Sequence, residues 1–245
     1  MVLGAINLRK SFNGTTVVNN VSFEVKPGEV VGLLGPNGAG KTTSFDMIVG
    51  LIKPESGNVT LYDKDITNFP VHTRANQGIG YLTQEPSVFK RLSVANNINL
   101  IWDGGTQNSE LRALNLKNKL EELLKEFDLW DLRDHMAISL SGGERRRVEI
   151  ARVLARDPKF ILLDEPFTGI DPIAIQEIQK IIIKLKSARN IGILLTDHNP
   201  RATLSITDRA YIIQDGKILF SGTAKEIAGN SLALKYYLGE DFRLD

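Results

Sequence analysis

The sequence contains no cysteine, few histidines and no long apolar run. The absence of cysteine among 245 residues excludes disulfides, thiolate nucleophiles and thiolate metal sites, and fits a reducing compartment. The three histidines, His72, His135 and His198, are too far apart in the sequence to indicate a metal-binding cluster. No stretch approaches the roughly 20 apolar residues that a membrane-spanning helix needs. Any membrane contact is therefore expected to be made through a partner.

The sequence also lacks an excess of charge of one sign. Its 30 basic and 29 acidic residues give a net charge of +1, so no overall field would draw the protein onto nucleic acid or an anionic membrane. The N-terminus lacks the basic start and the apolar run of a secretory signal. With 42% hydrophobic and 24% charged residues, the composition is that of a globular protein. We expect no nucleic-acid partner.

Short apolar runs separated by helical patterns predict an α/β fold. Apolar and polar residues alternate over residues 17–25, and the unbroken apolar run at 30–34 predicts a buried strand. Further apolar runs at 160–163 and 191–195 flank a helical pattern at 173–185. This order of strand, helix and strand is typical of a parallel sheet.

A segment without strand patterns interrupts this order at residues 92–157. Its apolar residues recur at helical spacing among many charges. We therefore expect a single domain over residues 1–245, in which residues 1–91 and 158–245 form the core and residues 92–157 form an inserted helical subdomain. The polar, glycine-containing residues 103–109 predict a surface loop.

A glycine-rich segment follows the apolar run at 30–34 and matches the pattern of a phosphate-binding loop. Glycines let backbone N–H groups turn toward phosphate oxygens, and the dipole of the following helix favours the anion. Lys41 is expected to reach the β- and γ-phosphates of ATP, and the Thr42 hydroxyl to coordinate Mg²⁺. The alternative is a flexible turn between strand and helix. The candidate nucleotide-binding residues here are Gly35, Pro36, Asn37, Gly38, Ala39, Gly40, Lys41, Thr42 and Thr43.

Two adjacent carboxylates follow the apolar run at 160–163. Such charges at the edge of a core are costly unless a cation or a reacting water uses them. Asp164 is expected to hold Mg²⁺, and Glu165 to polarise the water that attacks the γ-phosphate. Alternatively, the two carboxylates could cap the helix that follows. Their occurrence together with a phosphate-binding loop favours the catalytic interpretation.

The residues LSGGE at 140–144 combine a helix-start pattern with two glycines. Ser141 and Glu144 have the spacing of a capping box, while Gly142 and Gly143 would leave helix-start amides open to a second anion. Both roles can hold together. With the two motifs above, this segment closely resembles that of the nucleotide-binding subunits of ABC transporters. The resemblance covers essentially the whole chain.

The resemblance implies a P-loop NTPase core of the RecA type, with an antiparallel β subdomain and an inserted α-helical subdomain. It implies an enzyme that converts ATP and water to ADP and phosphate, with Mg²⁺ as cofactor, and couples this reaction to transport. In such subunits the segment at Ser141 closes the γ-phosphate held by a second copy, so a head-to-tail homodimer is expected. Two integral-membrane subunits would hold this cytoplasmic dimer at the inner membrane.

The family pattern also implies roles for several single residues. Gln84 matches the glutamine that contacts Mg²⁺ or water, and His198 matches the histidine that touches the γ-phosphate; both would act with Glu165 in catalysis. Asp171 matches an aspartate that crosses the dimer interface, and Phe12 takes the place of an aromatic residue under adenine. Each also has a plainer explanation. These are solvation for Gln84, a structural role for His198, helix capping for Asp171 and core packing for Phe12.

Three stretches indicate a narrower group within the family. Residues 139–152, 196–199 and 237–244 resemble those of the ATP-binding subunits of lipopolysaccharide export systems. This likeness implies a motor that powers the extraction of lipopolysaccharide from the inner membrane and its export to the outer membrane.

The membrane subunits would dock at a groove formed near Gln84 to Ser93. Phe89 offers an apolar contact there and Arg91 a polar one. The alternative for Lys90 and Arg91 is a solvated loop.

Three departures from the family pattern leave the transport system less defined than the reaction, and one of them is the more freely departing stretch at residues 51–69. Pro86 follows Gln84, where many relatives have a proline before the glutamine, and Thr168 stands where alanine is frequent. One alternative is the ATPase of a branched-chain amino-acid importer, which has similar size and motifs. Another is a soluble ABC protein acting on ribosomes or DNA. Such proteins usually carry two cassettes or a long coiled-coil insertion, and this sequence has neither.

Overall fold

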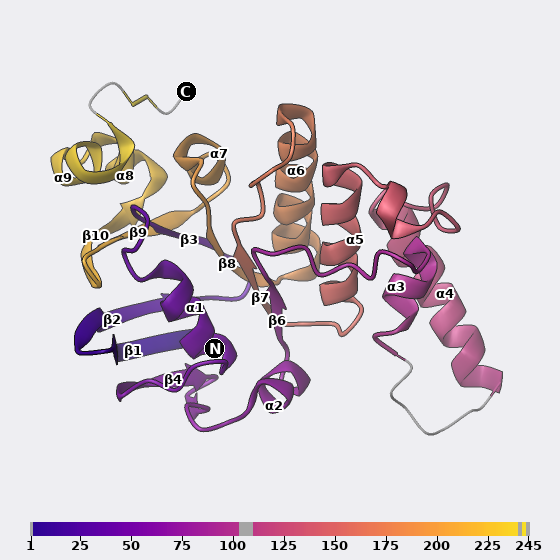
Figure 1. Cartoon of the computed structure of the whole chain (residues 1–245), viewed down its shortest axis with the longest axis horizontal. Helices are drawn as coiled ribbons and strands as arrows, with labels where there is room; N and C mark the ends of the chain where they lie inside the picture. The colour runs from indigo at the N-terminus through magenta and orange to yellow at the C-terminus, as the bar shows by residue number, and fades with distance from the viewer. Residues whose placement is uncertain (1, 103–109, 240–241, 244–245) are drawn as a thin grey trace.

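A six-stranded sheet runs through the middle of the molecule (Figure 1). The computed structural model describes residues 2–102, 110–239 and 242–243. The strands of this sheet are β3 (Val30–Leu34), β6 (Ile79–Leu82), β7 (Phe160–Asp164), β8 (Gly192–Thr196), β9 (Arg209–Gln214) and β10 (Lys217–Thr223). Their order is β10-β9-β3-β8-β7-β6; β10 pairs antiparallel with β9, and the other neighbours pair in parallel.

The parallel strands are buried on both faces, which explains their unbroken apolar runs. Val31 of β3 packs into one hydrophobic core, whereas Val30 packs into the core on the opposite face. The same alternation occurs in β7, where Leu162 belongs to the first core and Ile161 to the second. Successive side chains of a strand point to opposite faces, so a run without polar residues needs cover on both sides.

A helix and an antiparallel sheet cover one face. Helix α1 (Lys41–Val49) lies between the two sheets (Figure 1), and its Phe45, Met47 and Ile48 are buried in the core that they share. The antiparallel sheet contains β1 (Leu3–Phe12), β2 (Thr15–Val25), β4 (Ser56–Leu61) and β5 (Lys64–Asp65), in the order β2-β1-β4-β5.

Helices cover the other face and extend beyond the sheet on one side (Figure 1). Ile178 and Ile182 of α6 (Pro172–Arg189) share a core with Ile193 of β8. The remaining helices of this side fall between β6 and β7 in the chain, within residues 92–157; the predicted loop at 103–109 lies outside the described residues. They are α3 (Val94–Asn99), α4 (Glu110–Glu126), the 3-10 helix η1 (Ala137–Ser139) and α5 (Gly142–Leu154).

The C-terminal part packs near β9 and β10. Leu34, Ile212 and Ile227 form a third core, against which Tyr237 and Phe242 are partly buried. Of the stretch 237–244, the structure describes residues 237–239 and 242–243. Across the described ranges, no helix has the length and apolar character to cross a membrane. The remaining helices are α2 (Val71–Asn76), α7 (Pro200–Leu204), α8 (Ala224–Gly229), α9 (Ser231–Ala233) and the π-helix η2 (Leu234–Leu238).

Candidate functional site

The glycine-rich loop lies between β3 and α1, and close backbone contacts fix its path. A Cβ atom on Gly35 would lie 2.0 Å from the carbonyl oxygen of Ile213 in β9. Gly40 has a φ of 102°, and a Cβ atom there would lie 2.7 Å from the carbonyl oxygen of Val17. Larger residues at these two positions would push the loop away from the strands behind it, so this path requires glycine.

Lys41 begins α1 and is only 6% exposed. Its Nζ donates to the carbonyl oxygens of Gly35 (2.7 Å) and Pro36 (2.8 Å). Burial lowers the pKa of Lys41, and the carboxylates of Glu165 and Asp164 oppose this change. The loop thus surrounds a cation, and α1 starts without a side-chain cap. The free amides of a helix start together with a cation suit the binding of an anion.

A pocket of ≈ 310 Å³ opens at this loop. Most of its lining comes from the loop and the first turn of α1; Val17 comes from β2, and three further residues come from segments that follow α1 in the chain. The structure therefore brings Gln84, Glu165 and His198 to the glycine-rich loop. The full lining consists of Val17, Asn37, Gly38, Gly40, Lys41, Thr42, Thr43, Gln84, Glu165 and His198.

Asp164 ends β7 and carries a buried carboxylate oxygen. The residue is 1% exposed, and its Oδ1 has no hydrogen-bond partner within the described part of the chain. Its Oδ2 accepts a long hydrogen bond from the Tyr81 hydroxyl (3.5 Å). Burial raises the pKa of Asp164 to about 6, and the charges of Glu165 and Asp46 add to the effect. An unpartnered carboxylate oxygen in such a place fits a cation ligand.

The residues around Asp164 suit Mg²⁺ better than a metal that needs an all-protein cage. Over the ranges that the structure describes, no three His, Cys, Asp or Glu residues gather where they could hold a metal ion. Mg²⁺ is commonly held by one or two carboxylates together with water and substrate phosphates. The Thr42 hydroxyl and the Gln84 side chain line the pocket at Lys41 and carry oxygen atoms of the kind that Mg²⁺ prefers.

Glu165, in the loop after β7, contacts side chains from the loops after β6 and β8. It has a φ of 50°, a left-handed backbone that is uncommon for a residue with a side chain. Its Oε1 lies 2.5 Å from Nε2 of His198, and its Oε2 accepts a hydrogen bond from Nε2 of Gln84 (2.9 Å). Because β6, β7 and β8 run in parallel, their carboxyl ends bring these three residues to one edge of the sheet.

Arg146 of α5 supports this edge, although the sequence analysis did not identify it. Its buried guanidinium donates to the carbonyl oxygens of Asp164 (3.1 Å) and Glu165 (2.9 Å), and to that of Thr83 (3.1 Å). Glu149 completes the arrangement with a salt bridge of 2.9 Å. The only signal in the sequence is the spacing of this ion pair, which is typical of helix neighbours.

Asp197 is a second supporting residue that the sequence analysis did not identify. Its buried carboxylate accepts hydrogen bonds from the amides of Phe167 (2.8 Å) and Asn199 (2.9 Å). Its carbonyl oxygen accepts one from the Tyr237 hydroxyl (3.0 Å). These bonds join the loop after β7, the loop after β8 and the C-terminal part of the chain. Their partners are mainly backbone groups, which leave no pattern of side chains in the sequence.

The LSGGE segment lies apart from the pocket at Lys41. Ser141 to Glu144 are not among the described residues that line that pocket. They form a capping box, in which Oγ of Ser141 accepts from the amide of Glu144 (3.3 Å) and Oε2 of Glu144 accepts from the amide of Ser141 (2.7 Å). Asp171 likewise caps α6 through the amides of Ile173 and Ala174. The helix-capping alternatives for Ser141 and Asp171 are thus realised in the single chain.

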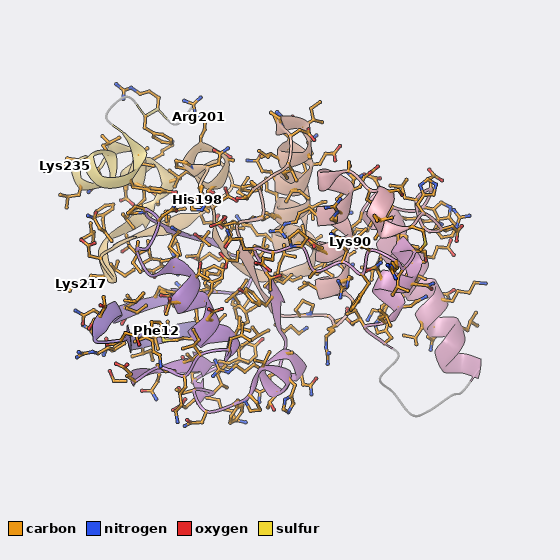
Figure 2. All side chains as sticks on the ribbon, viewed as in Figure 1. Phe12, Lys90, His198, Arg201, Lys217 and Lys235 are labelled. Carbon is orange, nitrogen blue, oxygen red and sulfur yellow. The ribbon has the colours of Figure 1, made fainter. Side chains whose placement is uncertain are left out.

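Phe12 also lies outside the pocket lining. It is 42% exposed at the end of β1, and Nζ of Lys10 lies 5.6 Å from the centre of its ring. Figure 2 shows Phe12 at the antiparallel sheet, Lys90 toward the helical side of the molecule, and His198 above Phe12 in the view. Because its ring is exposed, Phe12 is not a core residue, and core packing does not explain the aromatic side chain at this position.

A second, mostly apolar hollow of ≈ 390 Å³ lies between α2, β6 and α5. Leu51, Val71 and Ser87 are among its lining residues, as is Arg152. The Arg152 guanidinium also lies 5.0 Å from the ring centre of Phe89, which is half-exposed. Lys90 and Arg91, next in sequence, are exposed.

Known proteins show the same sequence pattern. The sequence signature of the family described as ABC transporter matches residues 18–168. The lipopolysaccharide export system ATP-binding protein LptB of Acidithiobacillus ferridurans is 52% identical over 243 residues, which cover 99% of each chain. The protein of the same name from Escherichia coli strain K12 is 51% identical over 242 residues, again with 99% of each chain covered.

Solved structures share the fold. A crystal structure of an ATP-binding cassette of an ABC transporter in its ADP conformation matches with a TM-score of 0.87 and 30% identity, covering 98% of this chain and 100% of that one. A dimeric ATP-binding cassette in a post-hydrolysis state, bound to ADP and phosphate, matches with a TM-score of 0.78 and 26% identity, covering 91% of this chain and 99% of that one.

Proposed function

The chain belongs to the ABC transporter family, and from this premise we propose that it powers the export of lipopolysaccharide. It is an ABC-type P-loop ATPase that binds nucleotide and hydrolyses ATP. The observation that carries the transport assignment is the identity of 52% and 51% to two lipopolysaccharide export ATPases, over 99% of each chain. The motor would drive the lipid from the inner membrane toward the outer membrane.

The pocket at Lys41 would hold the triphosphate of ATP. Lys41 and the amides of the glycine-rich loop would face the β- and γ-phosphates, and the exposed ring of Phe12 would stack on adenine. Thr42, Gln84 and Asp164 would hold Mg²⁺. When bound, the cation would neutralise part of the negative charge of the phosphates. Asp164 suits this role because its Oδ1 is buried without a partner.

The cluster at Glu165 would carry out the hydrolysis. The Glu165 carboxylate polarises the attacking water and accepts its proton, and His198 and Gln84 orient the groups around the γ-phosphate. The hydrogen bond that Glu165 accepts from Gln84 and its close contact with His198 support this assignment, because they hold the carboxylate at the pocket. The unusual backbone of Glu165 is the kind of local strain that is found at functional sites.

A second copy of the chain would complete the site. The LSGGE segment and Asp171 lie away from the chain's own pocket, which supports a head-to-tail homodimer in which Ser141 to Glu144 close the γ-phosphate of the partner. The similar solved structure of a dimeric cassette with ADP and phosphate is consistent with this arrangement. We propose the helical subdomain at 92–157 as the unit that carries this segment.

The hollow between α2 and α5 would receive a helix of an integral-membrane subunit. Its lining is mostly apolar, and the half-exposed ring of Phe89 with Arg152 above it extends this surface to the segment from Gln84 to Ser93. Two such subunits would place the dimer on the cytoplasmic face of the inner membrane.

Copurification of the native complex tests the transport assignment. The tagged chain should bring down two integral-membrane subunits of a lipid exporter, identified by mass spectrometry. A Phe89→Asp variant should lose them while keeping nucleotide binding, since Phe89 lies outside the pocket at Lys41. Recovery of a permease for amino-acid import, or of ribosomes without membrane proteins, would contradict the proposal.

A further inference from the structure

We infer that Thr168 is a positioning residue for ATP hydrolysis, whose hydroxyl holds one oxygen of Glu165 so that the other faces the reacting groups. The inference rests on the proposed role of Glu165 as the base. Oγ1 of Thr168 donates a hydrogen bond of 3.2 Å to Oε2 of Glu165. The sequence marked Thr168 only as a departure from the family pattern, and the contact with Glu165 is visible only in the folded structure.

The two oxygens of Glu165 have different surroundings. Oε2 accepts hydrogen bonds from Thr168 and from Nε2 of Gln84, whereas Oε1 lies against His198. The Oε2 side is therefore the anchored side. On the proposed function, Oε1 is the oxygen that would accept the proton of the attacking water.

The Gln84 side chain has separate atoms for its two assigned partners. Its Nε2 donates to Glu165, whereas its amide oxygen is the atom that would bind Mg²⁺. Thr168 supplies the second donor to Oε2 among the contacts described for Glu165. This donor lies in the same turn as Glu165, so it stays in place when the Gln84 side chain moves.

The loop after β7 keeps Thr168 beside Glu165. The amide of Thr168 donates to the carbonyl oxygen of Glu165 (3.3 Å), which closes a tight turn. The amide of Glu165 is bonded to the carbonyl oxygen of Thr196 (2.8 Å), and that of Phe167 to the carboxylate of Asp197 (2.8 Å). Asp171 caps the next helix, so the Thr168 hydroxyl is not needed there. Thr168 and Glu165, which share the side-chain hydrogen bond of 3.2 Å, therefore belong to one short turn that these backbone bonds hold in place.

Two variants of the chain test the inference in steady-state ATPase assays. Thr168→Val keeps the shape of the side chain without the hydroxyl, and Thr168→Ser keeps the hydroxyl. Thr168→Val should lower kcat by roughly tenfold, the size expected when one hydrogen bond to a charged group is lost. KM for ATP should stay within about twofold, because the bond is made to the base and not to the nucleotide. Thr168→Ser should restore most of the wild-type kcat.

The outcomes separate this inference from the proposed function. A wild-type kcat in Thr168→Val, or a serine variant as impaired as the valine variant, would overturn the role of Thr168. A rise in KM without a fall in kcat would do the same. Thr168→Ala supplies a second hydroxyl-free variant in case valine disturbs the turn. Glu165→Gln is measured in parallel: if it keeps full turnover, the proposed site itself is wrong, whatever Thr168 does.

Discussion

At the scale of single residues, burial determines how the acidic groups of the site behave. Asp164 is almost fully buried, and its unpartnered oxygen carries a negative charge that burial disfavours. Its pKa is therefore raised to about 6, with further contributions from the charges of Glu165 and Asp46. A group of this kind lowers the stability of the folded chain at neutral pH until a cation binds.

Asp164→Asn should therefore stabilise the chain when nucleotide and divalent cations are absent. The folded state binds the Asp164 proton more tightly than the unfolded state, so the destabilisation by Asp164 develops as pH rises from about 4 to about 6 and is complete above that range. The gain from asparagine should reach at most about 3 kcal/mol near pH 8 and shrink toward pH 4. Thermal unfolding with a chelator measures it. An equal gain at both ends of the range would contradict the prediction.

Lys41→Ala should weaken nucleotide binding by roughly tenfold or more, because the ammonium group makes charge-assisted contacts with phosphate oxygens. Titration with a fluorescent ATP analogue measures the change in Kd. Lys217→Ala serves as the matched control, since Lys217 is exposed on β10 and is not among the residues of the pocket. An unchanged affinity in Lys41→Ala would mean that the phosphates bind elsewhere.

The sequence identified the site residues that belong to short motifs, and it missed those that act through backbone groups. The glycine-rich loop and the pair at 164–165 are contiguous, and their chemistry is visible in the residue types. Arg146 and Asp197 bind carbonyl oxygens and amides of other segments. Any residue type presents such groups, so only the folded structure could reveal these contacts.

At the scale of secondary-structure elements, two helices start with the same capping box. Ser141 and Glu144 form it at α5, and Thr223 and Glu226 form it at α8. A capping side chain contributes about 1 kcal/mol to stability. The two sites therefore share one structural role, while only the first has a proposed role in the closure of a nucleotide site.

Ser141→Ala and Thr223→Ala separate capping from function. Both variants should lose about 1 kcal/mol in unfolding free energy, measured by denaturant titration. Only Ser141→Ala should also lower the ATPase rate of the dimer, because the hydroxyl that it removes would face the γ-phosphate of the second copy. Equal ATPase rates in the two variants would leave Ser141 with a capping role alone.

Among the elements, the long apolar runs were the most predictable. The predicted strands at 30–34, 160–163 and 191–195 correspond within one residue at each end to β3, β7 and β8. Short elements such as β6 and α3 were not predicted. Their few residues are only partly apolar, so they show no clear period, and contacts with neighbouring elements decide their structure.

At the scale of the whole molecule, hydrolysis should be a property of two copies. Glu165→Gln should retain ATP but hydrolyse it at a rate lower by roughly a hundredfold or more, because the amide cannot accept the proton of the attacking water. The variant should therefore accumulate as an ATP-bound dimer in gel filtration. The wild-type chain should lose specific activity on dilution. A monomer that remains fully active at low concentration would contradict the shared site.

The contact between Gly35 and Ile213 limits how the site can be altered by mutation. Lys41, Thr168 and Glu165 can each be replaced by a residue of similar size that lacks the functional group at the end of the side chain. Gly35 has no such freedom, because a single methyl group would meet the backbone of β9 at 2.0 Å. Any loss of activity in Gly35→Ala would thus reflect damage to the central sheet. This variant is therefore unsuitable as an inactive control.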